Sequence, residues 1–136
     1  MGQQQLLLIV LGVIIVGIAV VVGINVFTAS ASQANRDGIV ADLTNIASLA
    51  QQFYRKPAAL GGGSNAFDAS KGAAAAWSVP ASLSPTANMS VAVTATVAAQ
   101  TVTLVAVGTE TGKDGSTKVK VTMTVNPGSI ATTISN

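Results

Sequence analysis

Residues 6–27 form an apolar run, LLLIVLGVIIVGIAVVVGINVF, that contains no charged side chain. At about 1.5 Å of rise per residue, a helix of this length spans roughly 33 Å, enough to cross a bilayer core of about 30 Å. A cleaved secretory signal would have a basic start and a shorter apolar region, whereas this chain begins MGQQQ. Position 6 is Leu, which does not fit an N-myristoylation signal. The run therefore predicts a helix that is surrounded by lipid or by other helices.

The helical pattern continues beyond the apolar run. Apolar residues at i, i+3, i+4 and i+7 spacing predict an amphipathic helix, with polar residues such as Asp42 and Gln51 on its solvated face. Basic residues just before Pro57 suit a helix C-terminus. One nearly continuous helix over about residues 3–56 is predicted. The residues expected to pack it on the rest of the chain are Ile39, Leu43, Ile46, Ala50, Phe53 and Tyr54.

Three glycines, Gly12, Gly17 and Gly23, interrupt the apolar run. Each costs up to about 1 kcal/mol relative to Ala in a helix interior. Small residues let helices approach closely in lipid or in a bundle. Alternatively, the stretch from Gly17 to Gly23 is a weak section that loosens when subunits pack. The spacings of five and six residues do not match the GxxxG dimer motif, and we expect close helix packing at these glycines and at Ala19.

The C-terminal third alternates apolar and polar residues with period two, which predicts strands at 90–97, 101–107 and 117–125 and a short edge strand at 129–134. Turn residues such as Asp114-Gly115 and Pro127-Gly128 predict antiparallel hairpins. The expected fold class is α+β, with a long N-terminal helix packed on an antiparallel sheet of three or four strands. Its parts are the helix at 1–56, a loop-rich connector at 57–89 and a β head at 90–136.

The connector carries two large aromatic residues, Phe67 and Trp77. We expect them to anchor it on the helix or the sheet. A carbohydrate-stacking platform is the alternative for Trp77. The aromatic residues of the chain are too sparse to form a conducting path.

Side chains suited to catalysis are few. The chain has no His and no Cys, which removes the commonest general base and the commonest metal ligands. The loop with Glu110 and Asp114 lacks the ligand count of a calcium loop, and Asn88-Met89-Ser90 matches a glycosylation sequon. Charged residues are 9% of the chain, the net charge is +2, and the cations form no stripe for nucleic acid. We predict no catalytic residue, no metal site, no cofactor and no enzymatic activity.

The order of these segments resembles the type IV pilins and pseudopilins, although the resemblance in sequence covers only residues 1–55. In that family the mature chain begins with an apolar residue, carries Glu at its fifth position and starts its apolar run at the next. Setting Met1 at the first position places Gln5 at the acidic position and Leu6 at the start of the run. The family's Glu pairs with the N-terminal amine of a neighbouring subunit. Gln5 accepts a hydrogen bond from such an amine but brings no charge.

The basic leader of the family is not visible in this sequence. It was removed before the sequence starts, or this lineage skips cleavage, or the cut falls after Gly2. The alignment favours Met1 as the mature first residue.

The resemblance implies a structural subunit of an extracellular, type IV pilus-like helical filament on the cell surface. Its partners would be further copies of itself, the inner membrane before assembly and the pilus assembly machinery. The alternatives are a pseudopilin of a secretion system and a single-span membrane protein that presents a small β module. Roles in adhesion, twitching, DNA uptake and secretion are not distinguished by these residues. The implied assembly residues are Met1, Gln5, Gly12, Gly17, Ala19 and Gly23.

Overall fold

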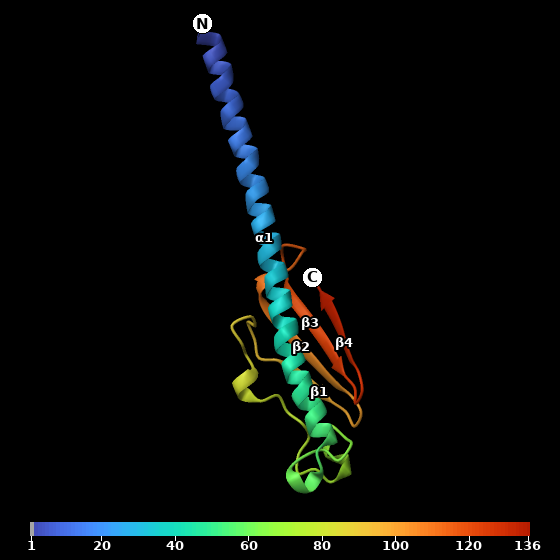
Figure 1. The fold of residues 1–136 in the computed structure, drawn as a ribbon. Coiled ribbons are helices and arrows are strands. Elements are labelled where there is room, and N and C mark those ends of the chain that lie inside the picture. Colours follow the sequence, from blue (N-terminus) through green and yellow to red (C-terminus); the bar gives the residue numbers. More distant parts are fainter. Residues whose placement is uncertain (1) are drawn as a thin grey trace. The chain divides into compact units, whose positions relative to one another are not determined.

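The computed structural model describes residues 2–136, so Met1, which was expected to take part in assembly, lies outside the described residues. One long helix, α1 (Gly2–Arg55), is followed by a four-stranded sheet (Figure 1). The strands are β1 (Thr94–Val97), β2 (Val102–Thr111), β3 (Lys118–Val125) and β4 (Ile130–Ser135). Short 3-10 helices lie between α1 and β1: η1 (Ala58–Leu60), η2 (Ala69–Lys71) and η3 (Ala81–Leu83). The predicted α+β class, with a long helix packed on a small antiparallel sheet, is confirmed.

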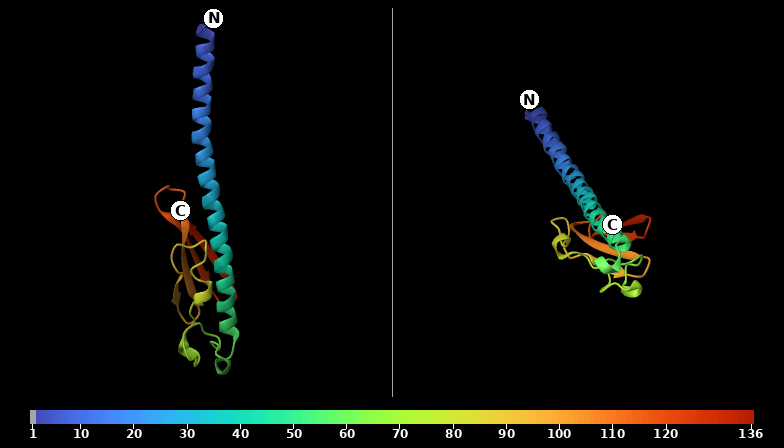
Figure 2. Two further views of the ribbon diagram at one scale, coloured as in Figure 1. Left: turned by 90° about the vertical axis from the view of Figure 1, so that its left-hand side faces the viewer. Right: turned by 60° about the horizontal axis from the view of Figure 1, so that its bottom comes forward.

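The chain forms two compact units, Met1–Ala31 and Ser32–Asn136, so the division falls inside α1. We call the second unit the head. In the head, the second half of α1 lies along one face of the sheet (Figures 1 and 2). The strand order is β1-β2-β3-β4, and each neighbouring pair is antiparallel. The sheet is therefore a simple meander with β1 and β4 at its edges.

The strand predicted at residues 90–97 is half as long in the structure, because β1 begins at Thr94. The backbone N–H of Val93 donates to Ser84 Oγ at 2.5 Å, and Val91 is 57% exposed. The residues just before Thr94 are therefore held by the connector and are not part of β1. Met89 still forms an isolated bridge to Gly108 of β2.

Strand β2 runs four residues further than the prediction, to Thr111, which shortens the expected loop at 108–116. The sequence did not predict this extension, because it begins at Gly108 and glycine usually weakens a strand. In the structure Gly108 allows α1 to approach closely: a Cβ built on it would lie 2.1 Å from Asn35 Oδ1. The β2–β3 register shifts between Val107 and Thr111, so the extension is irregular.

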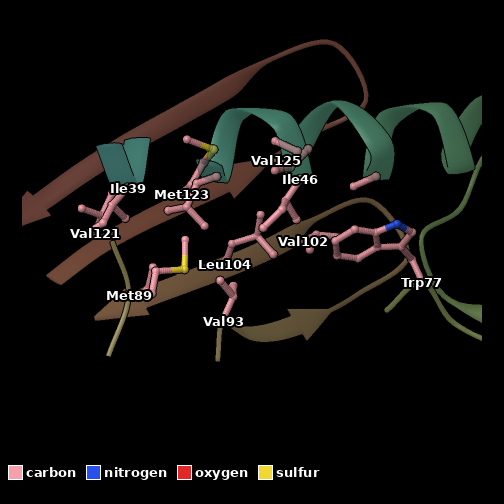
Figure 3. Close-up of a cluster of buried hydrophobic side chains, with 14 of the residues drawn as sticks. Ile39, Ile46, Trp77, Met89, Val93, Val102, Leu104, Val121, Met123 and Val125 are labelled. Atoms are coloured by element: carbon pink, nitrogen blue, oxygen red, sulfur yellow. The ribbon is translucent and has the colours of Figure 1, made fainter. Parts of the chain in front are cut away.

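The core of the head lies between α1 and the sheet. Ile39 and Ile46 of α1 point toward strand residues such as Leu104 and Val121 (Figure 3). The connector contributes Phe67, fully buried, and Trp77, 7% exposed, so the prediction that both are anchors is confirmed. The buried hydrophobic residues of the cluster are Ile39, Leu43, Ile46, Ala47, Ala50, Phe67, Trp77, Met89, Val93, Val102, Leu104, Ala106, Val119, Val121, Met123 and Val125.

The last turns of α1 hold the connector. Phe53 and Tyr54 are partly buried against the core, and the Tyr54 and Phe67 ring centroids lie 4.9 Å apart. The Phe67 N–H donates to the carbonyl of Ala99 at 3.0 Å, which ties the connector to the β1–β2 turn.

Candidate assembly surface

The first half of α1 buries none of its side chains within the chain. Every residue from 2 to 30 is exposed, and the large hydrophobic residues of the apolar run have exposed fractions of 53% to 76%. These residues lie on all sides of the helix, because the run is apolar at nearly every position. Among the described residues, α1 is the one helix long and apolar enough to cross a membrane. Such a helix needs an apolar environment, and the other described residues do not supply it.

The glycines of the run have no packing partner among the residues that the structure describes. A Cβ added to Gly12, Gly17 or Gly23 would meet no atom within 4 Å, and the helix continues unbroken past all three. Gln5 and Ala19 are exposed on the same segment. The helix-propensity cost of these glycines, up to about 1 kcal/mol each, is therefore not offset by contacts among residues 2–136.

A polar row on α1 holds the N-terminal part of the head. Ser32 Oγ donates to the Thr111 carbonyl at 2.5 Å. Asn35 Nδ2 donates to the Asn88 carbonyl at 2.9 Å and to Thr109 Oγ1 at 3.1 Å. Ser32 and Asn35 are each only 6% exposed, while Asn35 Oδ1 is buried without a partner.

These two contacts were missed in the sequence. Ser32 and Asn35 precede Ile39 by seven and four residues, so they extend the apolar stripe toward the N-terminus. That spacing is the signal that could have found them.

Asp42 and Gln51 do not lie on a solvated face, and the prediction was wrong for both. Asp42 Oδ2 accepts hydrogen bonds from Thr86 Oγ1 at 2.6 Å and from Asn88 Nδ2 at 3.1 Å. Gln51 Nε2 donates to the Asn126 carbonyl at 3.1 Å. Both residues flank the apolar stripe, where a side chain of medium length reaches the loops beside the sheet. The Asn88 nitrogen that a glycan would modify is already used in this contact.

Two carboxylates outside α1 stabilise turns. Hydrogen bonds from the Ser70 side chain and from the Ser70 N–H, at the start of η2, lower the pKa of Asp68. Asp114 accepts from Thr117 Oγ1 and from the N–H groups of Ser116 and Thr117, and these bonds lower its pKa. Both oxygens of Asp114 are thus engaged in its own turn. No group of three or more His, Asp or Glu side chains that could hold a metal occurs in the described part of the chain.

Trp77 lines a shallow hollow of about 270 Å³ together with Phe53 and residues 73–76. Because Trp77 is only 7% exposed, its ring offers little surface for stacking on a sugar. The structure therefore assigns Trp77 to the core.

Comparison of this chain with protein families, curated proteins and solved structures found no match.

Proposed function

We propose that this chain is the structural subunit of an extracellular, type IV pilus-like helical filament that assembles through the first half of α1. The observation that carries the proposal is the exposed apolar surface of residues 6–27 on the same helix that contributes one side of the head core. When the apolar first halves of α1 from many copies pack into one bundle, the heads on their second halves surround that bundle.

Hydrophobicity alone does not favour a bundle over a membrane. Burying one large aliphatic side chain from water contributes about 1.5–3 kcal/mol, but lipid and a helix bundle both supply that burial. What distinguishes the bundle is close packing at small residues, since lipid tails are as apolar as Leu. Gly12, Gly17, Ala19 and Gly23 provide such positions, and no contact within residues 2–136 explains the three glycines.

Gln5 suits a passage from lipid to the filament core. A neutral amide costs less to bury than a lone carboxylate. Its side-chain oxygen can accept a hydrogen bond from a neighbouring subunit, as the resemblance to pilins suggests.

The second candidate is a single-span anchor that holds the head at a membrane surface, with a pseudopilin as an intermediate case. The same exposed run supports it, because α1 is long and apolar enough to cross a bilayer. The two readings differ in what they require of the small residues. An anchor needs only an apolar run, whereas a bundle needs residues that let the helices approach.

The first test is electron microscopy of material sheared from the surface of expressing cells, with mass spectrometry on the same fraction. Thin helical fibres made of this chain are the expected result, and the mass gives the N-terminal residue of the assembled subunit. A single species that stays in the membrane pellet, with no fibres in the sheared fraction, refutes the filament and favours the anchor.

A variant pair separates the candidates further. The double substitution Gly17→Leu with Ala19→Leu is expected to lower fibre yield at least tenfold and to leave membrane insertion intact, since Leu raises apolarity. Val21→Leu is the matched control, because it enlarges a position that already carries a large side chain. Equal fibre yields from the two variants would contradict close packing at Gly17 and Ala19.

A further inference from the structure

The two edges of the sheet differ in how they are protected. Strand β4 has six residues, all of them exposed, and none is charged or proline. Proteins usually protect an edge strand by shortness, by charge, by proline, by a bulge or by a covering segment. Strand β4 has no such charge or proline, and it is longer than the four-residue β1 at the other edge. An open edge of this kind is a template for another strand.

The hydrogen-bond pattern between β3 and β4 determines which backbone groups of β4 point away from the sheet. The Asn126 N–H bonds the Ser129 carbonyl at 2.8 Å, which sets the β3–β4 hairpin. Bonded and non-bonded pairs alternate from there, because hydrogen bonds alternate in an antiparallel ladder. Ala131, Thr133 and Ser135 therefore bond β3, while the N–H and C=O groups of Ile130, Thr132 and Ile134 point outward. Three donors and three acceptors lie along this edge.

Strand β1 presents a shorter edge between two fixed ends. The N–H groups of Val93 and Phe67 bond Ser84 Oγ and the Ala99 carbonyl, which fastens the connector at both ends of β1. By the same alternation, starting from the Ala98–Thr101 bonds of 2.8 and 3.4 Å, the backbone groups of Ala95 and Val97 point outward. Two donors and two acceptors lie between the fastened ends.

We infer that β4 of one copy pairs with β1 of the next copy, so that the sheets of neighbouring heads join edge to edge. This inference rests on the proposed filament. The sheet has four strands, and each runs antiparallel to the one beside it, so β1 and β4 run in opposite directions. Copies that point the same way thus bring β4 beside β1 in antiparallel orientation. The contact joins two different surfaces, as an open helical polymer requires.

The side chains at the two edges match. Val121, Met123 and Val125 are buried on the helix-facing side, and their β4 neighbours Ile130 and Ile134 are 38% and 47% exposed on the same side. In the joined sheet these isoleucines would lie beside Ala95 and Val97, which are half-buried on the helix-facing side of β1.

On the outer side, Ala131 and Thr133 would lie beside Thr94 and Thr96. Pairs of β-branched residues stabilise sheets by roughly 0.2–1 kcal/mol each, and no like charges face one another because neither strand carries a charge.

Engineered cysteines test the pairing in the full chain, which has no cysteine of its own. Antiparallel registers that bond the outward groups place Thr133 opposite Thr96 or Thr94. Filaments of Thr133→Cys with Thr96→Cys, or of Thr133→Cys with Thr94→Cys, are treated with a mild oxidant and run on a denaturing gel. The expected result is a ladder of dimers, trimers and larger species from one of the two pairs. The matched control is Lys120→Cys with Thr96→Cys, which places an exposed thiol on the interior strand β3, and it is expected to give no ladder.

Each other outcome is decisive. Intact filaments without a ladder from either pair overturn the edge pairing but leave the proposed function standing. Dimers from the single variant Thr133→Cys, without larger species from either double variant, show β4 paired with β4 and overturn the proposal. A wild-type chain that forms no filaments removes the proposed function and this inference with it.

A proline substitution tests the same edge without cysteine chemistry. Thr132→Pro removes an outward N–H and leaves the β3–β4 bonds intact, since Thr132 does not bond β3. Filament yield is expected to fall at least tenfold relative to Thr132→Val, which keeps the N–H. Trp77 fluorescence should be the same in both variants, because the head core is unchanged. Equal filament yields would overturn the pairing.

Discussion

Replacing Gly108 with alanine is expected to loosen the contact between α1 and β2. The added Cβ would lie 2.1 Å from Asn35 Oδ1 and 3.0 Å from Ile39 Cδ1. Asn35 cannot turn away freely, because its Nδ2 donates to the Asn88 carbonyl and to Thr109 Oγ1. Losing both bonds costs about 0.5–1.5 kcal/mol each, and an overpacked core costs about 1–3 kcal/mol. The cheaper response sets the cost, and because both responses cost about 1–3 kcal/mol in total, the expected loss of stability is about 2 kcal/mol.

The source of this cost can be isolated with Asn35→Ala, which removes the oxygen that the new methyl group would meet. Alone, this change should cost only about 1 kcal/mol, because the Asn88 carbonyl keeps a bond from the Thr109 N–H at 3.2 Å and an unpartnered buried oxygen is removed. The double variant should then be about as stable as Asn35→Ala. The expected coupling is about 2 kcal/mol, within the range seen for contacting residues.

Trp77 is the only tryptophan and is buried, so its fluorescence reports unfolding of the head in the detergent-solubilised chain. For Gly108→Ala the unfolding midpoint should fall by roughly 8–16 °C, taking about 4–8 °C per kcal/mol for a domain near this size. Gly128→Ala is the control, since a Cβ there meets nothing within 4 Å, and it should leave the midpoint nearly unchanged. If the losses of stability from Gly108→Ala and Asn35→Ala simply add in the double variant, the clash with Asn35 is not the cause of the Gly108→Ala effect.

Three further changes test other parts of the head. Leu43→Ala should lower stability by about 2–5 kcal/mol, because it opens a cavity in the core, whereas Leu60→Ala at a position 66% exposed should change it little; chemical denaturation compares them. Asp42→Ala should cost about 1–3 kcal/mol, because two polar side chains lose their acceptor, and thermal unfolding measures it. The pKa of Asp114 lies below its ordinary 3.8, so its turn is stabilised above that pH and the effect is lost as pH falls through the folded pKa. Thr117→Val should raise the pKa of Asp114 toward 3.8 in an NMR titration, and no rise would show that the Thr117 hydroxyl is not a cause.

The periodicity of the sequence predicted the long helix and the sheet. The alternation at 117–125 predicted β3 to within one residue, because hydrophobic burial on one face imposes period two. The predicted strand ends at 101 and 125 likewise lie within one residue of the observed ends, Val102 and Val125, which pair directly. These are local patterns, and local patterns are what a single sequence displays.

The polar contacts of the head could not be predicted in the same way. Asp42 read as a solvated helix residue because its partners, Thr86 and Asn88, lie more than forty residues away in a connector without periodicity. Gly108 was predicted to lie just after a strand, because the close approach of α1 that it allows involves Asn35, which is 73 positions earlier in the chain. Propensity describes each residue by itself, while these roles exist only once the chain has folded. The exposed edge of β4 also depends on strand order, which alternation does not specify.

The contacts between α1 and the sheet of the head have a mechanical consequence. The polar bonds of Ser32, Asn35 and Gln51 and the apolar contacts from Ile39 to Ala50 are distributed along the helix. A pull on the head along the helix axis would strain these contacts together, in shear, and not one after another. The turn at residues 112–117 is closed by the bonds of Asp114 and by the Gly112 N–H, which donates to the Thr117 carbonyl at 2.7 Å. These bonds would open one after another and therefore at lower force. Under tension, the head would therefore yield first at that turn and last along the helix.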